Sequence, residues 1–158
     1  MQFLVADDHS IVRMGLRLML EDRYPLVRID EAENGDSIVE KIKQHDYDLL
    51  VLDFQMPNTD TFNIISWVLA RHADFKILIY SMASEKLYAG KLLKAGVRGF
   101  LSKEASNAEL LKAVEVVLAH GIYASDTAKN SISNDSVETA TVANPFTDLS
   151  EKELSVLN

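Results

Sequence analysis

The sequence predicts an α/β domain in which a doubly wound, five-stranded parallel sheet carries helices on both faces. Five short apolar runs alternate with segments whose apolar residues recur at helical spacing, and this alternation is typical of a parallel sheet. Two of the runs, Leu49–Leu52 and Ile77–Tyr80, are apolar at every position, as expected of strands that are buried on both faces. The length of 158 residues suits one such domain and leaves little over.

Each predicted element follows from its own pattern. The expected strands are Phe3–Ala6, Val27–Ala32, Leu49–Asp53, Ile77–Ser81 and Gly99–Ser102. The helices between and after them are marked by apolar residues at helical spacing: Ile11, Leu16, Leu18 and Leu20; Ile38 and Ile42; Phe62, Ile65 and Leu69; Leu87, Leu92 and Leu93; and Leu110, Leu111, Val114, Val117 and Leu118. Ser106 and Glu109 have the spacing of a capping box that begins the fifth helix, and Gly121 is expected to end it.

The composition changes after Tyr123. We therefore assign residues 1–123 to the sheet domain. Residues 124–146, rich in Ser, Thr, Asn, Asp and Ala, are expected to form a linker. Residues 147–158 begin a new helical pattern with Ser150 and Glu153 as a second capping box. The pattern is cut off at Asn158, which predicts that a second domain is truncated.

The overall composition excludes several classes of protein. A formal net charge of −8 argues against a chain that binds nucleic acid by itself, because such proteins need clustered Lys and Arg. There is no cysteine, which excludes disulfides and thiolate metal sites. No run of about eighteen apolar residues predicts a membrane span, and no signal peptide precedes the first strand. We expect a cytoplasmic protein with no membrane association.

Polar residues follow four of the predicted strands. Asp7 and Asp8 come after the first strand, Asp53 and Ser81 end the third and fourth, and Lys103 follows the fifth. In a doubly wound sheet, binding sites form at the carboxyl ends of the strands. These five residues are therefore expected to meet at one edge. Each has an ordinary explanation when it is taken alone, such as a turn or a solvated side chain, and the combination carries the prediction.

The chemistry of this set points to phosphoryl transfer. Three neighbouring carboxylates repel one another, and a hard divalent cation relieves that repulsion. Mg²⁺ fits best, because it prefers oxygen ligands and leaves room for a phosphate oxygen. Lys103 can pair with a phosphate, and the Ser81 hydroxyl can donate to one. Asp53 is then the nucleophile that would form an aspartyl phosphate.

Beyond this reading from the residues, the chain resembles the receiver domains of two-component response regulators over residues 1 to about 121. The matching segments are Val5–Asp8, Asp53–Pro57, Ser81, Lys94–Gly96 and Gly99–Lys103. The resemblance implies a flavodoxin-like sheet of strand order 2-1-3-4-5. It also implies a phosphoprotein that receives its phosphoryl group from a sensor histidine kinase. Such a domain is a regulatory phosphoacceptor rather than an enzyme, since it catalyses only its own phosphorylation and dephosphorylation.

The resemblance also assigns roles to single residues. It makes Asp53 the phosphoacceptor, Asp8 a direct Mg²⁺ ligand and Asp7 a ligand acting mostly through water. Gln55 lends a backbone carbonyl to the metal, and its side chain lies where the family tunes dephosphorylation. The implied switch residues are Ser81, which turns toward the phosphoryl group, and Phe100, whose rotamer follows Ser81; Lys103 pairs with the phosphate. The side chains of Leu87, Tyr88, Lys91 and Leu92 that remain exposed are candidate contacts for a second receiver or an output domain.

The C-terminal residues resemble a second family. The segment 149–157 looks like the start of a LuxR-type helix-turn-helix domain, and 121–125 is similar to the corresponding segment of regulators named for NarL and FixJ. The resemblance implies a transcription regulator that forms a homodimer on activation. It would contact DNA only through the missing C-terminal domain.

The sequence leaves three alternative functions to compare with this one. A stand-alone phosphorelay receiver would lack the helix that begins near residue 149. A haloacid-dehalogenase-type phosphohydrolase places Asp-x-Asp-x-Thr after its first strand, whereas this chain has Asp7-Asp8-His9-Ser10. A flavodoxin-like FMN binder needs a phosphate loop at that position, where two carboxylates would repel the phosphate. His9 itself is expected to be a loop residue near the start of the first helix.

Overall fold

The computed structural model describes residues 1–130 and 132, and its strands and helices alternate as predicted. The strands are β1 (Gln2–Ala6), β2 (Arg28–Ala32), β3 (Leu49–Leu52), β4 (Ile77–Ser81) and β5 (Gly99–Ser102). The helices are α1 (Ser10–Arg23), α2 (Gly35–Gln44), α3 (Thr61–Arg71), α4 (Glu85–Ala95) and α5 (Asn107–Leu118). All pairings are parallel, and the strand order β2-β1-β3-β4-β5 confirms the predicted sheet.

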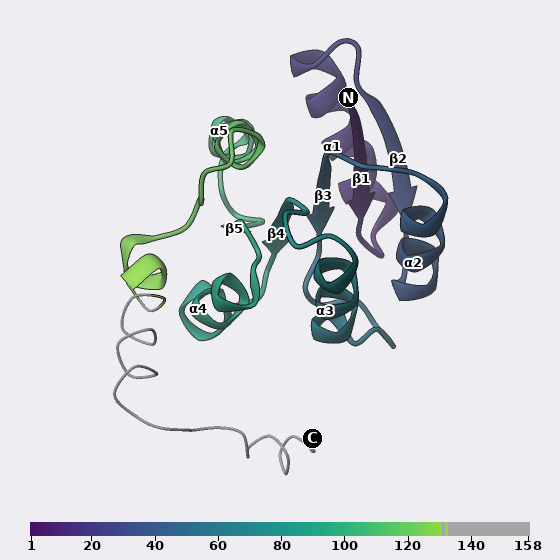
Figure 1. Ribbon diagram of the computed structural model, residues 1–158. Helices are drawn as coiled ribbons and strands as arrows, with labels where there is room; N and C mark the ends of the chain where they lie inside the picture. The colour runs from purple at the N-terminus through teal and green to yellow at the C-terminus, as the bar shows by residue number, and fades with distance from the viewer. Residues whose placement is uncertain (131, 133–158) are drawn as a thin grey trace.

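The sheet separates two hydrophobic cores. Helices α1 and α5 cover one face, and α2, α3 and α4 cover the other (Figure 1). Successive residues of each strand point to opposite faces, so Leu4, Leu50 and Ile79 belong to the α2–α3–α4 side, whereas Val5 and Val51 belong to the α1–α5 side. These strands are apolar on both faces because both are buried.

The register of the strands aligns their carboxyl ends. Ala6 is paired with Leu52, and Ser81 is paired with Ser102. The ladder continues into the next residues, because Asp53 N–H donates to the Ala6 carbonyl at 2.9 Å and Lys103 N–H donates to the Ser81 carbonyl at 3.0 Å. The residues that directly follow β1, β3 and β5 are thus held at one edge of the sheet.

Side-chain caps start four of the helices α1 to α5. The side chains of Asn34, Asp60, Ser84 and Ser106 accept hydrogen bonds from the first turns of α2, α3, α4 and α5. The predicted capping box of Ser106 and Glu109 is confirmed. Helix α1 differs, because its N-cap residue is His9, which makes no capping hydrogen bond with its side chain. The initial turn of α1 is therefore left without this stabilisation.

Two helices depart from the predicted pattern. In α1, Leu16 and Leu20 are buried, but Ile11 is 73% exposed and Leu18 is 64% exposed, so the apolar face predicted from all four residues was partly wrong. Helix α5 ends at Leu118, three residues before the expected stop at Gly121. The left-handed backbone after it falls on His120, with φ 68°.

The packed part of the chain continues past Tyr123, the residue after which we expected a linker. Tyr123 forms a parallel bridge with Gly99, donating to the Arg98 carbonyl and accepting from Phe100 N–H, both at 2.9 Å. The edge of β5 is thus covered by backbone. Residues 126–130 are helical, and Ala128 is buried in the core on the α4 side. The helix expected at 149–157 lies outside the described residues.

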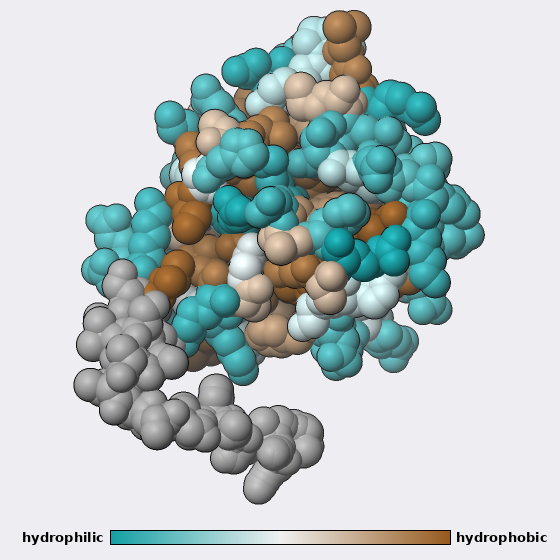
Figure 2. Space-filling view, viewed as in Figure 1, coloured by the Kyte–Doolittle hydropathy of each residue, from teal (hydrophilic) through white to brown (hydrophobic). Residues whose placement is uncertain are grey.

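The face of the molecule shown in Figure 2 is mainly polar. Hydrophilic residues form most of this face, and hydrophobic residues are exposed between them. Among the described residues, no helix is both long and apolar enough to cross a membrane.

Candidate functional site

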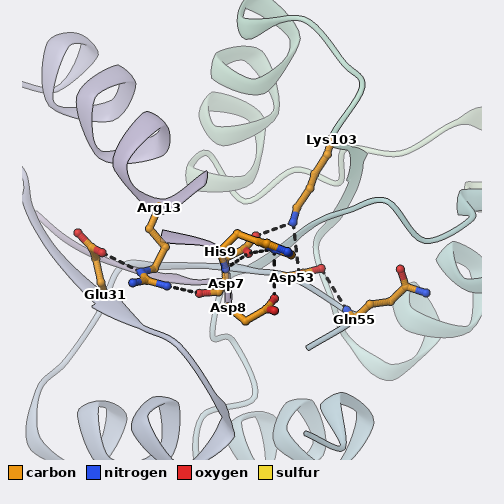
Figure 3. A network of polar contacts seen from close by, with 8 residues as sticks. All are labelled: Asp7, Asp8, His9, Arg13, Glu31, Asp53, Gln55 and Lys103. Atoms are coloured by element: carbon orange, nitrogen blue, oxygen red, sulfur yellow. Dashed lines mark hydrogen bonds and ion pairs between the residues drawn. The ribbon is translucent and has the colours of Figure 1, made fainter. Parts of the chain in front are cut away.

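Three carboxylates and one ammonium meet at the carboxyl edge of the sheet, as the sequence predicts (Figure 3). Asp7 follows β1 and is 1% exposed, and Asp53 follows β3 and is 3% exposed. The Nζ atom of Lys103 lies 2.6 Å from Oδ2 of Asp7 and 3.3 Å from Oδ2 of Asp53. Lys103 therefore links two carboxylates that are almost completely removed from water.

Lys103 is held in its charged form by this environment. Burial opposes the charge of its ammonium group, but the hydrogen bond from Lys103 to Asp7 and the negative charges of Asp53 and Asp7 outweigh that cost and raise its pKa above the ordinary value. A group that remains protonated next to Asp53 can pair with a phosphate placed on it.

The acidic group also leaves one oxygen unsatisfied. The Oδ1 atom of Asp8 is buried and has no hydrogen-bond partner among the described residues. One ligand atom each from Asp7, Asp8, His9 and Asp53 lies within 4.8 Å of all the others. A buried carboxylate oxygen without a donor is costly unless a cation satisfies it. The residues present therefore fit a hard divalent cation such as Mg²⁺.

The loop after β3 fixes the position of Asp53. The Gln55 backbone N–H donates to Oδ1 of Asp53 at 3.1 Å, while the Gln55 side chain is exposed. Thr61, which is buried at the start of α3, donates from its hydroxyl to the Phe54 carbonyl at 2.8 Å. These bonds tie both ends of the loop to the sheet and to α3. One oxygen of Asp53 is thus oriented by backbone and the other by Lys103.

Ser81 and Phe100 lie in the interior next to this edge. Ser81 is fully buried, and its hydroxyl oxygen accepts from the Ala83 backbone N–H at 3.1 Å. Phe100 is 1% exposed and belongs to the hydrophobic core on the α4 side. In this structure Phe100 is a core aromatic residue, and Ser81 makes a local bond within the β4–α4 loop.

The four residues singled out on α4 divide by exposure. Leu87 is 72% exposed and Leu92 is fully buried. Tyr88 is partly buried, with its ring 4.9 Å from the ring of Phe54, and Lys91 is exposed. Leu87 and Lys91 are the members of the set that remain open to a contact.

Two further residues lie near the carboxylates. Arg13 was not identified from the sequence, and His9 was expected to be a loop residue near the start of the first helix. His9 places Nδ1 3.1 Å from Oδ1 of Asp7 and 3.3 Å from Oδ1 of Asp8. Arg13 donates from Nη1 to the Asp7 carbonyl at 2.6 Å and from Nε to Oε1 of Glu31 at 2.8 Å. Both residues follow Asp8 closely, at the first turn of a helix that starts beside the site. This spacing was the feature of the sequence that could have indicated their position.

Arg13 anchors the acidic loop to β2. Its hydrogen bond to Glu31 is the main cause that lowers the pKa of that carboxyl group. Arg17 binds the second oxygen of Glu31 and also the Ile29 carbonyl. The Asp7 backbone is therefore fixed by an ion-pair network that runs from α1 to β2 and does not occupy the site.

Comparison with known proteins identifies the family to which this chain belongs. Residues 3–115 match the response regulator receiver domain family. The oxygen regulatory protein NreC of Staphylococcus carnosus (strain TM300) is 32% identical over 163 residues, covering 99% of this chain and 75% of NreC.

Solved structures agree. A LuxR-family two-component response regulator from Aurantimonas sp. SI85-9A1 has a TM-score of 0.74 at 27% identity, covering 86% of this chain and 97% of that one. The response regulator TrrA from Thermotoga maritima, solved in complex with Mg²⁺–BeF, has a TM-score of 0.66 at 27% identity, covering 73% and 97% of the two chains. Together with the predicted fold and the carboxylate cluster, these matches show that the chain belongs to the response regulator receiver domain family.

Proposed function

We propose that this chain is a phosphorylation-controlled regulator that accepts a phosphoryl group from a sensor histidine kinase on Asp53. The observation that carries the proposal is the position of Asp53, which is 3% exposed and has one oxygen 3.3 Å from the Lys103 ammonium. Asp7, Asp8, Asp53 and the backbone carbonyl of Gln55 are the proposed ligands of Mg²⁺. When bound, the cation would offset negative charge on the transferring group.

Different residues of the chain have different roles in the phosphoryl transfer. A carboxylate oxygen of Asp53 attacks phosphorus, forming an O–P bond while the P–N bond to the donor histidine breaks and the electron pair returns to that ring. The Gln55 N–H holds the Asp53 carboxylate in one orientation. Less conformational entropy is therefore lost when the carboxylate reacts. Lys103 stabilises charge on the phosphoryl oxygens from the side of β5.

Phosphorylation would change the local bonds of Ser81 and Lys103. Lys103 is paired with Asp7 at 2.6 Å, and the Ser81 hydroxyl accepts from Ala83. A phosphoryl group on Asp53 offers both side chains a new acceptor, so the arrangement in which they reach it is favoured. Phe100, which pairs with Ile79 in the neighbouring strand, would pass this change to β5 and α4.

We further propose that the output is control of transcription. The similarity to a LuxR-family regulator and to NreC supports it. In this proposal residues 1–123 are the receiver and 124–146 are the linker, whose first residues pack against the receiver through Ala124 and Ala128. Residues 147–158 begin a LuxR-type helix-turn-helix domain that would make the DNA contacts. The active form would be a cytoplasmic homodimer, and Leu87 and Lys91 are candidate contacts. The alternative, a stand-alone phosphorelay receiver, shares the same chemistry at Asp53.

The test is covalent modification. The chain is incubated with acetyl phosphate and Mg²⁺ and its intact mass is measured, in parallel with Asp53→Asn and with Asp46→Asn, a carboxylate outside the site. One added phosphoryl group on the parent and on Asp46→Asn, absent from Asp53→Asn, is the expected result. No adduct on the parent with acetyl phosphate or with a phosphorylated histidine kinase, or an undiminished adduct on Asp53→Asn, refutes the proposal.

A further inference from the structure

The segment after α5, residues 123–130, passes around the edge of β5 from the α5 side of the sheet to the α4 side (Figure 1). Tyr123 fixes its start through backbone bonds to Arg98 and Phe100. Ala128, in the helical part of the segment, is buried in the hydrophobic core on the α4 side. The segment contains the first residues of the proposed linker, so a change in its position is passed on to the chain that follows.

A polar contact joins this segment to α4. The backbone N–H of Ser125 donates to Oε2 of Glu85, the first residue of α4, at 2.9 Å, although the two residues are 40 positions apart in the sequence. Ser125 also starts the helical part of the segment, because its hydroxyl accepts from the Ala128 N–H at 3.2 Å. The carboxylate of Glu85 thus lies at the start of two helical stretches, where the partial positive charge of helix N-termini favours it.

An open groove lies beside this contact. It has a volume of about 440 Å³, and Glu85 and Ser125 line it together with residues of β5, α5 and the start of the segment, among them Phe100, Glu109 and Tyr123. On this side, therefore, little close-packed structure opposes a shift of Glu85 and of the Ser125 backbone bonded to it.

The loop that leads into Glu85 begins at Ser81, four residues earlier in the chain. The Ser81 hydroxyl accepts from the Ala83 N–H at 3.1 Å, and Ser84 caps α4 by accepting from the Leu87 N–H at 3.2 Å. When the Ser81 hydroxyl turns to a phosphoryl group on the acidic site, the Ala83 N–H loses this acceptor. The loop and the first turn of α4, which includes Glu85, are then held less firmly.

We propose that the Glu85–Ser125 bond holds the segment after α5 against α4 in the unphosphorylated state and breaks when Asp53 is phosphorylated. Breaking the bond releases the first residues of the proposed linker. The inference rests on the proposed function, because the phosphoryl group on Asp53 is what changes the loop before Glu85.

The coupling is reciprocal. A contact made only in the unphosphorylated arrangement opposes any ligand that favours the other arrangement, and the two effects have the same magnitude. Removing the Glu85–Ser125 bond should therefore strengthen the binding of a phosphoryl mimic at Asp53, although Glu85 does not touch that site.

The test measures the affinity of the 158-residue chain for beryllofluoride, which mimics a phosphoryl group on a carboxylate, in the presence of Mg²⁺. Two variants remove the bond from its two ends. Glu85→Ala deletes the acceptor, and Ser125→Pro deletes the N–H donor without changing α4. Lys86→Ala, which shortens the exposed neighbour of Glu85 in the same turn of α4, is the control. Amide hydrogen exchange of residues 124–130 is followed in the parent and in Glu85→Ala.

The expected result is that beryllofluoride binds Glu85→Ala and Ser125→Pro about 5-fold more tightly than the parent, and binds Lys86→Ala as tightly as the parent. Beryllofluoride should speed amide exchange of residues 124–130 in the parent. In Glu85→Ala this exchange should already be fast and change little on binding.

An affinity that is unchanged or weaker in Glu85→Ala overturns the inference, as does exchange in the parent that does not respond to beryllofluoride. A tighter affinity in Glu85→Ala that Ser125→Pro does not reproduce would come from the start of α4 alone, and it also overturns the inference.

An Asp53→Asn variant separates this failure from that of the proposed function. If beryllofluoride binds the parent but not Asp53→Asn, and removing the Glu85–Ser125 bond has no effect, the phosphoacceptor stands and only the role of Glu85 is wrong. If the parent does not bind beryllofluoride in an Asp53-dependent manner, the proposed phosphoacceptor fails and the inference fails with it.

Discussion

The ammonium of Lys103 lies 2.6 Å from Asp7 and 3.3 Å from Asp53, so its shorter contact is with the carboxylate that is not the proposed phosphoacceptor. Both carboxylates are nearly inaccessible to water. Lys103 therefore compensates a pair of buried negative charges in this state. To pair with a phosphoryl group on Asp53 it needs to move only from one neighbour toward the other.

Replacing Lys103 should make stability depend strongly on metal. Lys103→Gln leaves Asp7 and Asp53 without the ammonium, and the free energy of unfolding should fall by about 3 kcal/mol in chelator. Added Mg²⁺ should recover a large part of this loss, because a cation offsets the same charges. Urea denaturation with and without Mg²⁺ measures both values. Lys112→Gln, on the exposed side of α5, should change stability by less than about 0.5 kcal/mol. Equal losses in the two variants, or no Mg²⁺ dependence, would contradict the charge-compensating role.

Arg13 should act on the site without belonging to it. Arg13→Ala removes the hydrogen bond to the Asp7 carbonyl and the pair with Glu31, which should cost about 1–3 kcal/mol of stability. Because the backbone of Asp7 is loosened, Mg²⁺ affinity should also fall severalfold. Thermal unfolding and calorimetry measure the two effects. Arg28→Ala, at an exposed position in β2, is the control. Wild-type metal affinity in a destabilised Arg13→Ala would show that the network supports the fold alone.

The cluster at the carboxyl edge was predictable because it depends on topology. Asp7, Asp53 and Lys103 directly follow strands of a parallel sheet, and the ends of such strands meet at one edge whatever the side-chain packing. The strand order then made β1 and β3 neighbours. Arg13 was not predicted, and His9 was placed near the start of the first helix without its contacts to the carboxylates, because both sets of contacts depend on the direction in which the first turn of α1 leaves the sheet. A lone His or Arg beside an acidic pair has many ordinary explanations.

Burial along the helices was predicted less well for a similar reason. Ile11 and Leu18 are apolar and were expected on the buried face of α1, yet they are exposed. Only the side of α1 that carries Leu16 and Leu20 faces the sheet. Residues 124–146 are poor in large apolar side chains and were therefore expected to form a linker. The described part of this segment packs through Ala124, Ala128 and Ile132, next to Tyr123, whose backbone bonds to the edge of β5. Hydropathy patterns do not register contacts of that kind.

The packed segment after α5 should contribute to the stability of the domain. Ala128 is 6% exposed against the core on the α4 side, and Ala128→Glu should lower the free energy of unfolding by about 1–3 kcal/mol by burying a charge or displacing the segment. Ala108→Glu, exposed in the first turn of α5, should be neutral or slightly stabilising because an acid suits a helix N-terminus. Urea denaturation distinguishes them. Identical midpoints for the two variants would mean that residues 126–130 do not support the fold.

The Tyr47–Asp30 bond should produce a pH signature in stability. The Tyr47 hydroxyl donates to Oδ2 of Asp30 at 2.5 Å. This bond is the main cause that lowers the pKa of Asp30 below 3.8. Burial, and then the bond to Asp30, raise the pKa of Tyr47 above its ordinary 10.0. Asp30 therefore stabilises the fold at pH values above its ordinary pKa, and this stabilisation is lost as pH falls through its lowered pKa. Tyr47 stabilises the fold at pH values below 10.0, and this stabilisation is lost as pH rises toward its raised pKa.

Tyr47→Phe should therefore be less stable than the parent by about 1 kcal/mol near neutral pH. The difference should shrink both below the ordinary pKa of Asp30 and above that of Tyr47. Urea denaturation across pH measures it. A difference that stays constant from acid to alkaline pH would show that the two groups are not coupled in this way.

The most direct test of the central claim is to locate the phosphoryl group. After reaction with acetyl phosphate and Mg²⁺, borohydride reduces an aspartyl phosphate to homoserine and releases phosphate, and peptide mass mapping then identifies the residue. Homoserine at position 53 is the predicted result. Homoserine at position 7 or 8, or a phosphoryl group retained on His9, would contradict the assignment of Asp53 as the phosphoacceptor.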